Sequence, residues 1–421
     1  MSAPPGRSSA RWRSEYAAGQ TSTDADARSV DADVAGAVLR TAGAVLRERV
    51  AQAAGIDADF SRDLAERVAD FTVDGGRRMR PRLLWWSMRA CGGGARSADT
   101  EAALRLGVAV ELIQTCALVH DDVMDGSALR RGRLAMHVCL ASRPGPAPGS
   151  VLGEAFGTSA AVLVGDLALA WADDTVADTA MAAATRKRVL GVWRAMRTEM
   201  VAGQYLDVHG QATGARSAAR AIRTAYLKSA LYSVVRPISL GAALAGAGED
   251  TTRALSSAGR CAGIAFQLRD DLLGVFGDPA MTGKPSGGDV REGKPTYLLA
   301  VARARARARR DQRTRSLLDA AVGRADLSEA ALADVREALV ATGARADVEA
   351  RADRLMRQAE RHLDRAGVEA EPGQRLLGLL RSVAGTCPGP GAHEDVPEAA
   401  KPGWGAPASS LRAATGGGTT P

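Results

Sequence analysis

The sequence predicts an all-α protein on the strength of two observations. Aromatic residues make up only 4% of the 421 residues, whereas Ala, Leu and Val abound, and this composition favours close-packed helices over a sheet. Apolar residues also recur at helical spacing, and no stretch alternates convincingly as a strand would. We expect helices at approximately 33–53, 60–72, 79–91, 99–123, 157–175, 181–208, 217–246, 252–275, 294–308, 314–322, 328–342, 345–366 and 372–384.

The chain divides into one helical region and two terminal segments. Residues 1–32 show little periodicity, and residues 386–421 are dense in Pro, Gly, Ser and Thr. We therefore predict a disordered N-terminal segment (1–32), one catalytic domain (33–385) and a disordered C-terminal tail (386–421). The Gly- and Pro-containing segment 277–293 is expected to be a loop.

Charge and cysteine usage narrow the possible partners and location. The net charge of +7 suits an anionic small substrate as well as a nucleic acid. No aromatic residues interleave with the arginine-rich run 303–310, so we expect no nucleic-acid partner. Five cysteines without paired spacing indicate reduced thiols and a cytoplasmic location. We expect no signal peptide and no transmembrane segment, because no uncharged apolar run reaches about 18 residues.

Two acidic clusters occur within apolar, helix-forming stretches, at 121–125 (Asp-Asp-Val-Met-Asp) and 270–274 (Asp-Asp-Leu-Leu-Gly). Asp121 and Asp125 are four residues apart and so share one helix face. Carboxylates beside apolar surface need a positive partner, and Mg²⁺ binds to a few carboxylates together with water and phosphate oxygens. Two such clusters facing each other across a cavity would hold a diphosphate through bridging metal ions.

Basic residues near turns and helix starts could complete a diphosphate site. They are the arginines of segment 75–81 after Gly75-Gly76, the pair Arg130-Arg131 after the first acidic cluster, Lys228 beside Ser229, and Lys284 and Lys294 around the expected loop. The planar arginine fork suits phosphate oxygens. Lys228 lies in an apolar stretch and needs a partner, unless it is a surface lysine whose stem covers apolar residues.

Taken in order, these motifs resemble the trans-polyprenyl diphosphate synthase family, which includes farnesyl and geranylgeranyl diphosphate synthases. The resemblance covers about residues 33–384. It rests on segments 75–81, 121–125 with 130–131, 165–167, 199–207, 228–229, 266–271 and 283–285. It implies a single-domain helical bundle around a central hydrophobic cavity, of the isoprenoid synthase type, and a homodimer.

The resemblance also implies a role for each site residue. Asp121 and Asp125 would bind two Mg²⁺ ions and Asp270 a third, about three per active site, with Asp122 and Asp271 in supporting positions. The allylic diphosphate would be bound by Arg130, Lys228 and Lys284. The diphosphate of isopentenyl diphosphate would be bound by Arg77, Arg80, Gln114 and Arg131, and the reacting region would be lined by Gln267, Ser229 and Lys294.

The chain departs from the family pattern at four places. Arg77 stands where the family usually has Lys, and Ser229 where it has Thr. Gly274 replaces the last Asp of a full second motif, and Leu134-Ala135 replaces a common Pro-Thr. Arg77 and Ser229 keep the chemical capacity, whereas Gly274 changes the carboxylates available to the third metal.

The reaction implied is a Mg²⁺-dependent head-to-tail condensation of isopentenyl diphosphate with an allylic diphosphate (dimethylallyl, geranyl or farnesyl). Metals and cations would stabilise the departing diphosphate, and closure of segment 277–293 would exclude water. The released diphosphate would accept the final proton, so His120 is interpreted as structural and not as a general base.

Small residues before the first acidic cluster predict a long product. Cys116 and Ala117 lie one helical turn back from Asp121, and one turn of about 5.4 Å is roughly one isoprene unit in depth. In the resembled family an aromatic residue at this place stops growth early, so the resemblance implies geranylgeranyl diphosphate as the product. For the product, the alternative is a longer chain. For the residues that end the channel of the growing tail, the alternatives are Trp85, Trp86 and Leu112. For the function, the alternatives are a class I terpene cyclase and a non-catalytic synthase subunit.

Overall fold

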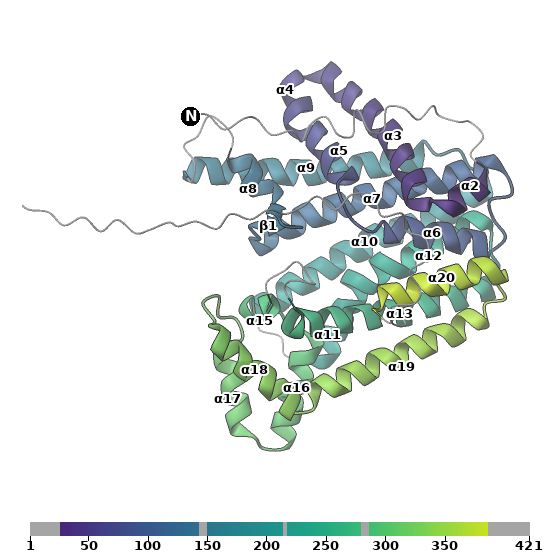
Figure 1. Ribbon diagram of the computed structural model, residues 1–421. Helices are drawn as coiled ribbons and strands as arrows, with labels where there is room; N and C mark the ends of the chain where they lie inside the picture. Colours follow the sequence, from purple (N-terminus) through teal and green to yellow (C-terminus); the bar gives the residue numbers. More distant parts are fainter. Residues whose placement is uncertain (1–25, 143–149, 214–216, 279–285, 386–421) are drawn as a thin grey trace, which may run out of the picture. The chain divides into compact units, whose positions relative to one another are not determined.

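The computed structural model describes residues 26–142, 150–213, 217–278 and 286–385. These residues are almost entirely helical, which confirms the predicted all-α class (Figure 1). They all belong to one compact unit.

The elements follow one another with short connections. The first are α2 (Ala27–Ala32), α3 (Val34–Ile56), α4 (Ala58–Phe60), the π-helix η1 (Ser61–Ala65), α5 (Glu66–Val73), α6 (Met79–Ala90) and α7 (Ser97–Asp125). Next come β1 (Leu129–Arg130), β2 (Arg133–Leu134), α8 (Met136–Ala141), α9 (Val151–Ala177), α10 (Ala183–Thr213), α11 (Ala218–Ala225), the π-helix η2 (Tyr226–Val235), α12 (Arg236–Ala245) and α13 (Glu249–Phe276). The last are α15 (Gly288–Arg291), α16 (Tyr297–Ala308), α17 (Gln312–Ala321), α18 (Glu329–Ala341), α19 (Ala344–Asp364) and α20 (Ala370–Val383).

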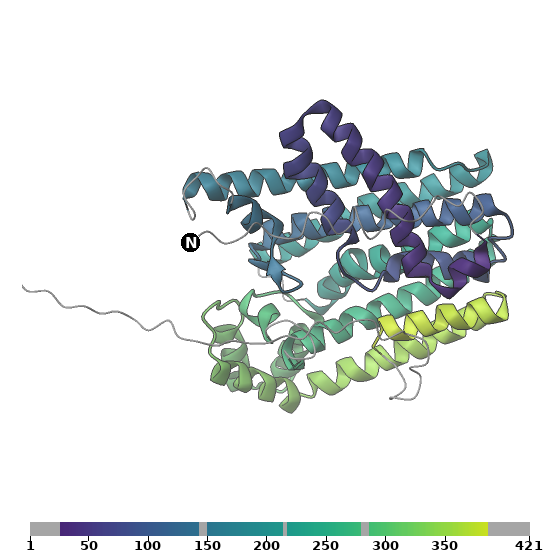
Figure 2. The same cartoon turned by 45° about the horizontal axis from the view of Figure 1, so that its top comes forward.

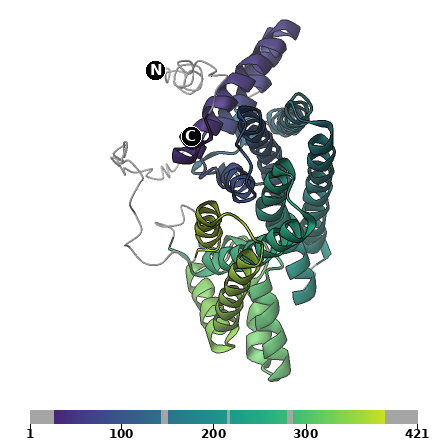
Figure 3. The same cartoon turned by 90° about the vertical axis from the view of Figure 1, so that its right-hand side faces the viewer.

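Two long helices, α7 and α13, carry the acidic clusters through the interior. Helix α7 packs against α9, α6 and α3, and α13 packs against η2 and α19. Figures 1 and 2 show α7 beside α9, and α13 beside α19. Figure 3 looks along the bundle, with α3 (purple) on one side and α19 (yellow-green) on the other. Both helices contribute buried apolar side chains to one hydrophobic core, which also includes residues of the helices packed around them.

Helix α2 corrects the N-terminal boundary, because residues 27–32 were expected to be disordered. Asp26 caps this helix by accepting a hydrogen bond from the backbone N–H of Arg28. Ala27 and Val30 are buried in the core. A cap and two docked apolar side chains are enough to order one and a half turns, although the segment is too short to show periodicity.

A two-stranded hairpin follows α7, where the sequence indicated no strand. Leu129 pairs with Leu134 and Arg130 with Arg133, so the connecting turn contains only Arg131 and Gly132. Both turn residues have positive φ, 53° and 74°, which matches the right-handed twist of a tight hairpin. Strands of two residues are too short to give an alternating pattern.

Helices α7 and α9 are long and apolar enough to cross a membrane by length and composition alone. The apolar window is 72% buried in α7 and 44% buried in α9. Core helices of soluble proteins pass the same test, so it is weak evidence for a membrane span.

Candidate active site

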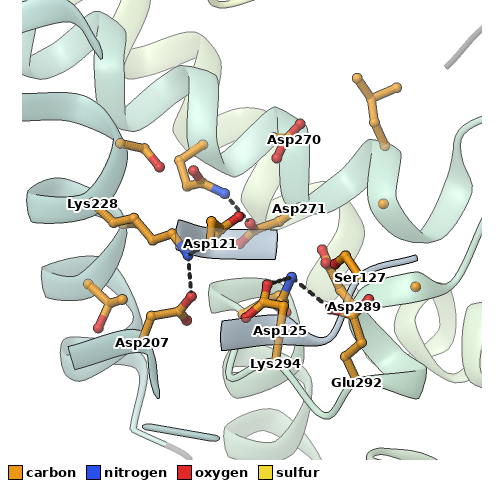
Figure 4. Close-up of a pocket in the computed structure, with 18 of the residues that line it drawn as sticks. Asp121, Asp125, Ser127, Asp207, Lys228, Asp270, Asp271, Asp289, Glu292 and Lys294 are labelled. Atoms are coloured by element: carbon orange, nitrogen blue, oxygen red, sulfur yellow. Dashed lines mark hydrogen bonds and ion pairs between the residues drawn. The ribbon is translucent and has the colours of Figure 1, made fainter. Parts of the chain in front are cut away.

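Both acidic clusters line one pocket of about 860 Å³ (Figure 4). Asp121 and Asp125 reach it from α7, and Asp270 and Asp271 reach it from α13. The predicted residues Arg77, Arg130, Arg131, Lys228, Ser229, Gln267 and Lys294 also line it. The fold thus brings together groups that are about 150 positions apart in the sequence.

Asp121 and Asp125 occupy the last turn of α7, which ends at Gly126 in the left-handed conformation (φ 63°). The C-terminal end of a helix carries partial negative charge, so two carboxylates there repel the helix dipole and each other. Burial and the charge of Asp121 raise the pKa of Asp125. This arrangement requires cations close to both side chains.

Lys228 supplies one of these cations. Its Nζ lies 3.0 Å from Asp121 Oδ1 and 2.5 Å from Asp207 Oδ2 (Figure 4). Burial alone would raise the pKa of Asp121, but Lys228, with a hydrogen bond from Gln204 and the charge of Arg130, outweighs it and lowers that pKa. The interpretation of Lys228 as a solvated surface lysine is therefore wrong.

Lys228 belongs to the ten-residue π-helix η2, within a region predicted to be one regular helix. Pro237, just beyond it, has no N–H, and its ring would clash with the carbonyl four residues earlier in an α-helix. The change from α-helix to π-helix thus lies next to a residue that disfavours regular α-helix, and π-segments often occur at functional sites. On the facing helix α10, a Cβ at Gly203 would lie 2.5 Å from the backbone nitrogen of Lys228. Gly203 therefore permits the close approach that positions Lys228.

The hairpin directs two arginines to different partners. Arg130 Nε donates to Asp122 Oδ1 at 2.8 Å, and Arg130 Nη2 donates to Asp121 Oδ2 at 3.2 Å. Arg131 Nη1 donates to the carbonyl of Asp74 at 2.7 Å. Asp122 is fully buried, and its Oδ2 has no hydrogen-bond partner. Arg130 thus binds two carboxylates of the first cluster and also lines the pocket.

The second cluster divides into one pocket carboxylate and one buried anchor. Asp271 accepts hydrogen bonds from Gln267 Nε2 at 2.9 Å and from the backbone N–H of Tyr297 at 3.2 Å. Burial raises the pKa of Asp271 to about 8, against the lowering effect of Gln267. Asp271 is therefore bonded once within α13, through Gln267, and once to α16, through Tyr297, while it lines the pocket together with Asp270.

Lys294 faces the first cluster from the opposite wall. Its Nζ lies 3.3 Å from Asp125 Oδ2 and 2.7 Å from Glu292 Oε2. Burial would lower the pKa of Lys294, but the hydrogen bond to Glu292 and the charge of Asp125 raise it. Lys294 therefore stays charged between the two acids.

Several predicted residues are not among the described residues that line this pocket. Arg80 donates to Ser233 Oγ at 2.7 Å and stacks over the ring of Tyr232. The side-chain oxygen of Gln114 is buried without a hydrogen-bond partner. Cys116 and Ala117 are absent from the pocket lining, and Lys284 falls outside the described residues.

Four further polar residues join the site without a role predicted from the sequence. Gln204 donates to Asp121 Oδ1 at 3.0 Å, and Asp207 is bonded to Lys228. Asp289 and Glu292 line the wall that carries Lys294. Gln204 and Asp207 belong to the motif at 199–207, and a buried acid in that helix was the available signal.

His120 is held between α7 and α9, as its structural interpretation expected. Its Nε2 lies 3.0 Å from the carbonyl of Val162, and its Nδ1 lies 3.7 Å from Cys116 Sγ. A Cβ at Gly165 would lie 2.1 Å from His120 Nε2, so only glycine leaves room for the ring. His120 does not line the pocket.

The charge of the pocket tests whether metal ions fit. Of the described residues that line it, seven are acidic and five are basic, so an anionic substrate alone would meet net repulsion. The side chain of Asp125 is only 6% exposed, yet its Oδ1 has no hydrogen-bond partner. In the described part of the chain, no three His, Cys, Asp or Glu side chains form a ready-made metal site. An oxygen-only set of this kind fits Mg²⁺, which takes its remaining ligands from water and phosphate.

Comparison with known proteins identifies the family. The polyprenyl synthetase family model matches residues 62–339. The chain belongs to the polyprenyl synthetase family. It is therefore a prenyltransferase of the trans-prenyl diphosphate synthase type.

Similar members of this polyprenyl synthetase family differ in product. A geranylfarnesyl diphosphate synthase from Aeropyrum pernix is 31% identical over 73% of this chain and 88% of its own length. A (2E,6E)-farnesyl diphosphate synthase from Mycobacterium tuberculosis is 31% identical over 73% of this chain and 79% of its own. A geranylgeranyl pyrophosphate synthase structure from Corynebacterium glutamicum, complexed with isoprenyl diphosphate and magnesium, has a TM-score of 0.77 and 34% identity. That match covers 87% of this chain and 99% of the other.

Proposed function

We propose that this chain condenses isopentenyl diphosphate with an allylic diphosphate in the pocket between α7 and α13, giving geranylgeranyl diphosphate. One observation carries the proposal: Asp121 and Asp125 line the same pocket as Asp270, with Lys228 and Lys294 beside the first pair. A longer polyprenyl product is the second candidate, because a similar enzyme is named for geranylfarnesyl diphosphate.

Magnesium fits the carboxylates of this pocket. We assign Asp121, Asp125 and Asp270 as ligands for about three ions. Bound there, Mg²⁺ would neutralise the charge that develops on the departing diphosphate. Asp122 and Asp271 act through their neighbours, because the first holds Arg130 and the second is bonded to Gln267 and Tyr297.

The basic residues have separate binding roles. Lys228 and Arg130 already lie within hydrogen-bond distance of the Asp121 carboxylate, so they would bind an allylic diphosphate held by the same cluster, together with Lys284. Arg77 and Arg131 would bind isopentenyl diphosphate at the hairpin wall, with Arg80 and Gln114 from the α6–α7 side. Ser229, Gln267 and Lys294 would line the space between the two substrates.

Two further effects are proposed to speed the condensation, the proximity of the two substrates and the exclusion of water. Two diphosphates held on neighbouring walls place the alkene near the allylic carbon, which removes much of the entropic cost of the encounter. Exclusion of water from the pocket would protect the allylic cation from being quenched. The released diphosphate is the proposed acceptor of the final proton.

The catalytic unit is proposed to span residues 33–385. Leu46 of α3 and Leu376 and Leu380 of α20 are fully buried, so helices on both sides of the matched region contribute to the core. A cytoplasmic location is proposed from the unpaired spacing of the five cysteines.

We also propose a homodimer. Leu152, Phe156 and Leu163 share one face of α9 and are 78%, 47% and 55% exposed. Val201, Tyr205 and Val208 likewise form an exposed face of α10. Apolar faces of this kind mark interaction surfaces, and a second copy would bury both.

The test is incubation with labelled isopentenyl diphosphate, Mg²⁺ and dimethylallyl, geranyl or farnesyl diphosphate in turn, followed by chromatography of the dephosphorylated alcohols. We expect a C20 alcohol that is lost on chelation of Mg²⁺. The variant Asp121→Asn should be inactive. The variant Asp334→Asn, which makes the same charge change at an exposed position of α18, should retain activity. Hydrocarbon released without isopentenyl diphosphate would indicate a cyclase and overturn the proposal, and so would the absence of any product.

A further inference from the structure

The second acidic cluster lacks a third carboxylate at its own position. Asp270 and Gly274 are four residues apart on α13, so a side chain at 274 would lie on the same face as Asp270. Each oxygen of Asp271 already accepts a hydrogen bond, one from Gln267 and one from the backbone of Tyr297. Within α13, only Asp270 is therefore left to serve a metal ion.

The space at Gly274 is filled by another acid. A Cβ built on Gly274 would lie 2.7 Å from Asp289 Oδ2 and 3.4 Å from its Cγ. The backbone keeps the two positions together, since the N–H of Gly287 donates to the carbonyl of Gly274 at 2.7 Å. Figure 4 shows Asp289 on the wall shared with Glu292, and both line the pocket.

A separate observation indicates that this pocket suits a cation. The Asp125 side chain is only 6% exposed, and its Oδ1 has no hydrogen-bond partner. A buried carboxylate oxygen without a partner is costly, unless a cation binds to it. Asp125 belongs to α7, and it lines the same pocket as Asp270 of α13 and Asp289 of α15, so a cation bound there would be shared between these carboxylates.

We propose that Asp289 supplies the second carboxylate of the Asp270 half of the metal site, in the space that a side chain at 274 would otherwise take. This inference rests on the proposed function. It accounts for how the chain keeps a third metal site although Gly274 interrupts its second motif. It also explains why 274 is glycine, since any larger residue would displace the Asp289 carboxylate.

The experiment transfers the carboxylate between the two positions. The variants are Asp289→Asn, Gly274→Asp, and the double variant Gly274→Asp with Asp289→Ala; Asp334→Asn is the control of equal charge. Two properties are measured: the Mg²⁺ concentration at half-maximal activity, and the rise in melting temperature caused by Mg²⁺ with inorganic diphosphate. The second measurement needs no catalysis.

We expect Asp289→Asn to raise the half-saturating Mg²⁺ concentration by ~10-fold or more and to reduce the thermal shift. Gly274→Asp alone should lower the melting temperature, because two side chains compete for one space. The double variant should recover most of both losses, which a merely structural role of Asp289 would not allow.

Two results would overturn the inference. The first is an Asp289→Asn variant whose Mg²⁺ dependence and thermal shift match those of wild type and Asp334→Asn. The second is a double variant no better than Asp289→Asn. If wild type itself shows neither product nor a thermal shift with Mg²⁺ and diphosphate, the proposed function fails instead.

Discussion

Lys228 illustrates how single residues set the electrostatics of the pocket. Its ammonium group lies between the carboxylates of Asp121 and Asp207 and is only partly exposed. Burial would lower the pKa of Lys228, but the two carboxylates outweigh that effect and raise it. Lys228 therefore partly neutralises these two carboxylates before any metal ion binds.

Replacing Lys228 by Met should destabilise the metal-free protein by roughly 2 kcal/mol, between the values for exposed and fully buried pairs. The reason is that Asp121 and Asp207 would lose their shared cation. Mg²⁺ should restore part of the loss, and more than it adds to wild type. Urea unfolding with and without Mg²⁺ checks this, and equal stability of the two proteins in chelator would contradict it.

Cys116, together with Ala117, is proposed to leave room for a long product, because its side chain is small. Its side chain is 2% exposed and lies next to His120, and burial raises its thiol pKa to about 12, so it behaves as a small apolar group. Cys116→Phe should shorten the main product, because the ring would fill the space one turn below Asp121. Ala117→Phe is the neighbouring comparison. If the alcohol profile is unchanged in both variants, the residue that ends the channel of the growing product is another one, such as Trp85, Trp86 or Leu112.

At the scale of elements, close helix contacts decide where the catalytic side chains lie. Helix α10 approaches η2 at Gly203, and α9 approaches α7 at Gly165. In the first case the obstacle to a larger residue is the backbone of Lys228, which cannot rotate away. Such contacts transmit small changes in packing directly to the site.

Gly203→Ala should therefore destabilise the protein by about 1–3 kcal/mol and reduce activity further than stability, because it shifts Lys228. Gly191 is the matched control in the same helix, since nothing lies within 4 Å of its Cβ position. Gly191→Ala should stabilise the helix by up to about 1 kcal/mol. Thermal unfolding and steady-state kinetics measure both effects; equal behaviour of the two variants would contradict the role of Gly203.

The sequence predicted most helices but missed several local features, including the short helix α8 and the helix α15 inside the expected loop 277–293. Three others have identifiable reasons. The hairpin at 129–134 has strands too short for an alternating pattern, and α2 is too short for a helical one. The π-helix η2 lies just before Pro237 in a continuous helical run, and helical periodicity alone does not reveal such a change of register.

At the scale of the molecule, the exposed apolar faces of α9 and α10 predict assembly. Phe156→Glu with Leu163→Glu should give a monomer by light scattering, whereas wild type should give a dimer, because the charges would be buried without partners. Leu129→Glu on the hairpin is a control, since Leu129 is 60% exposed on a separate element. A monomeric wild type, or a double variant that remains dimeric, would place the interface elsewhere or remove it.

The sequence by itself determined the helical class, the two acidic clusters and the family resemblance, because these depend on residue type and on spacing within one helix. Spacing of four residues was enough to pair Asp121 with Asp125. Only the tertiary structure decided which carboxylates face the pocket. Asp271 is bonded to the backbone of Tyr297 while it lines the pocket, and Asp289 lies beside Gly274, because contacts between separate helices depend on packing geometry that no local pattern encodes.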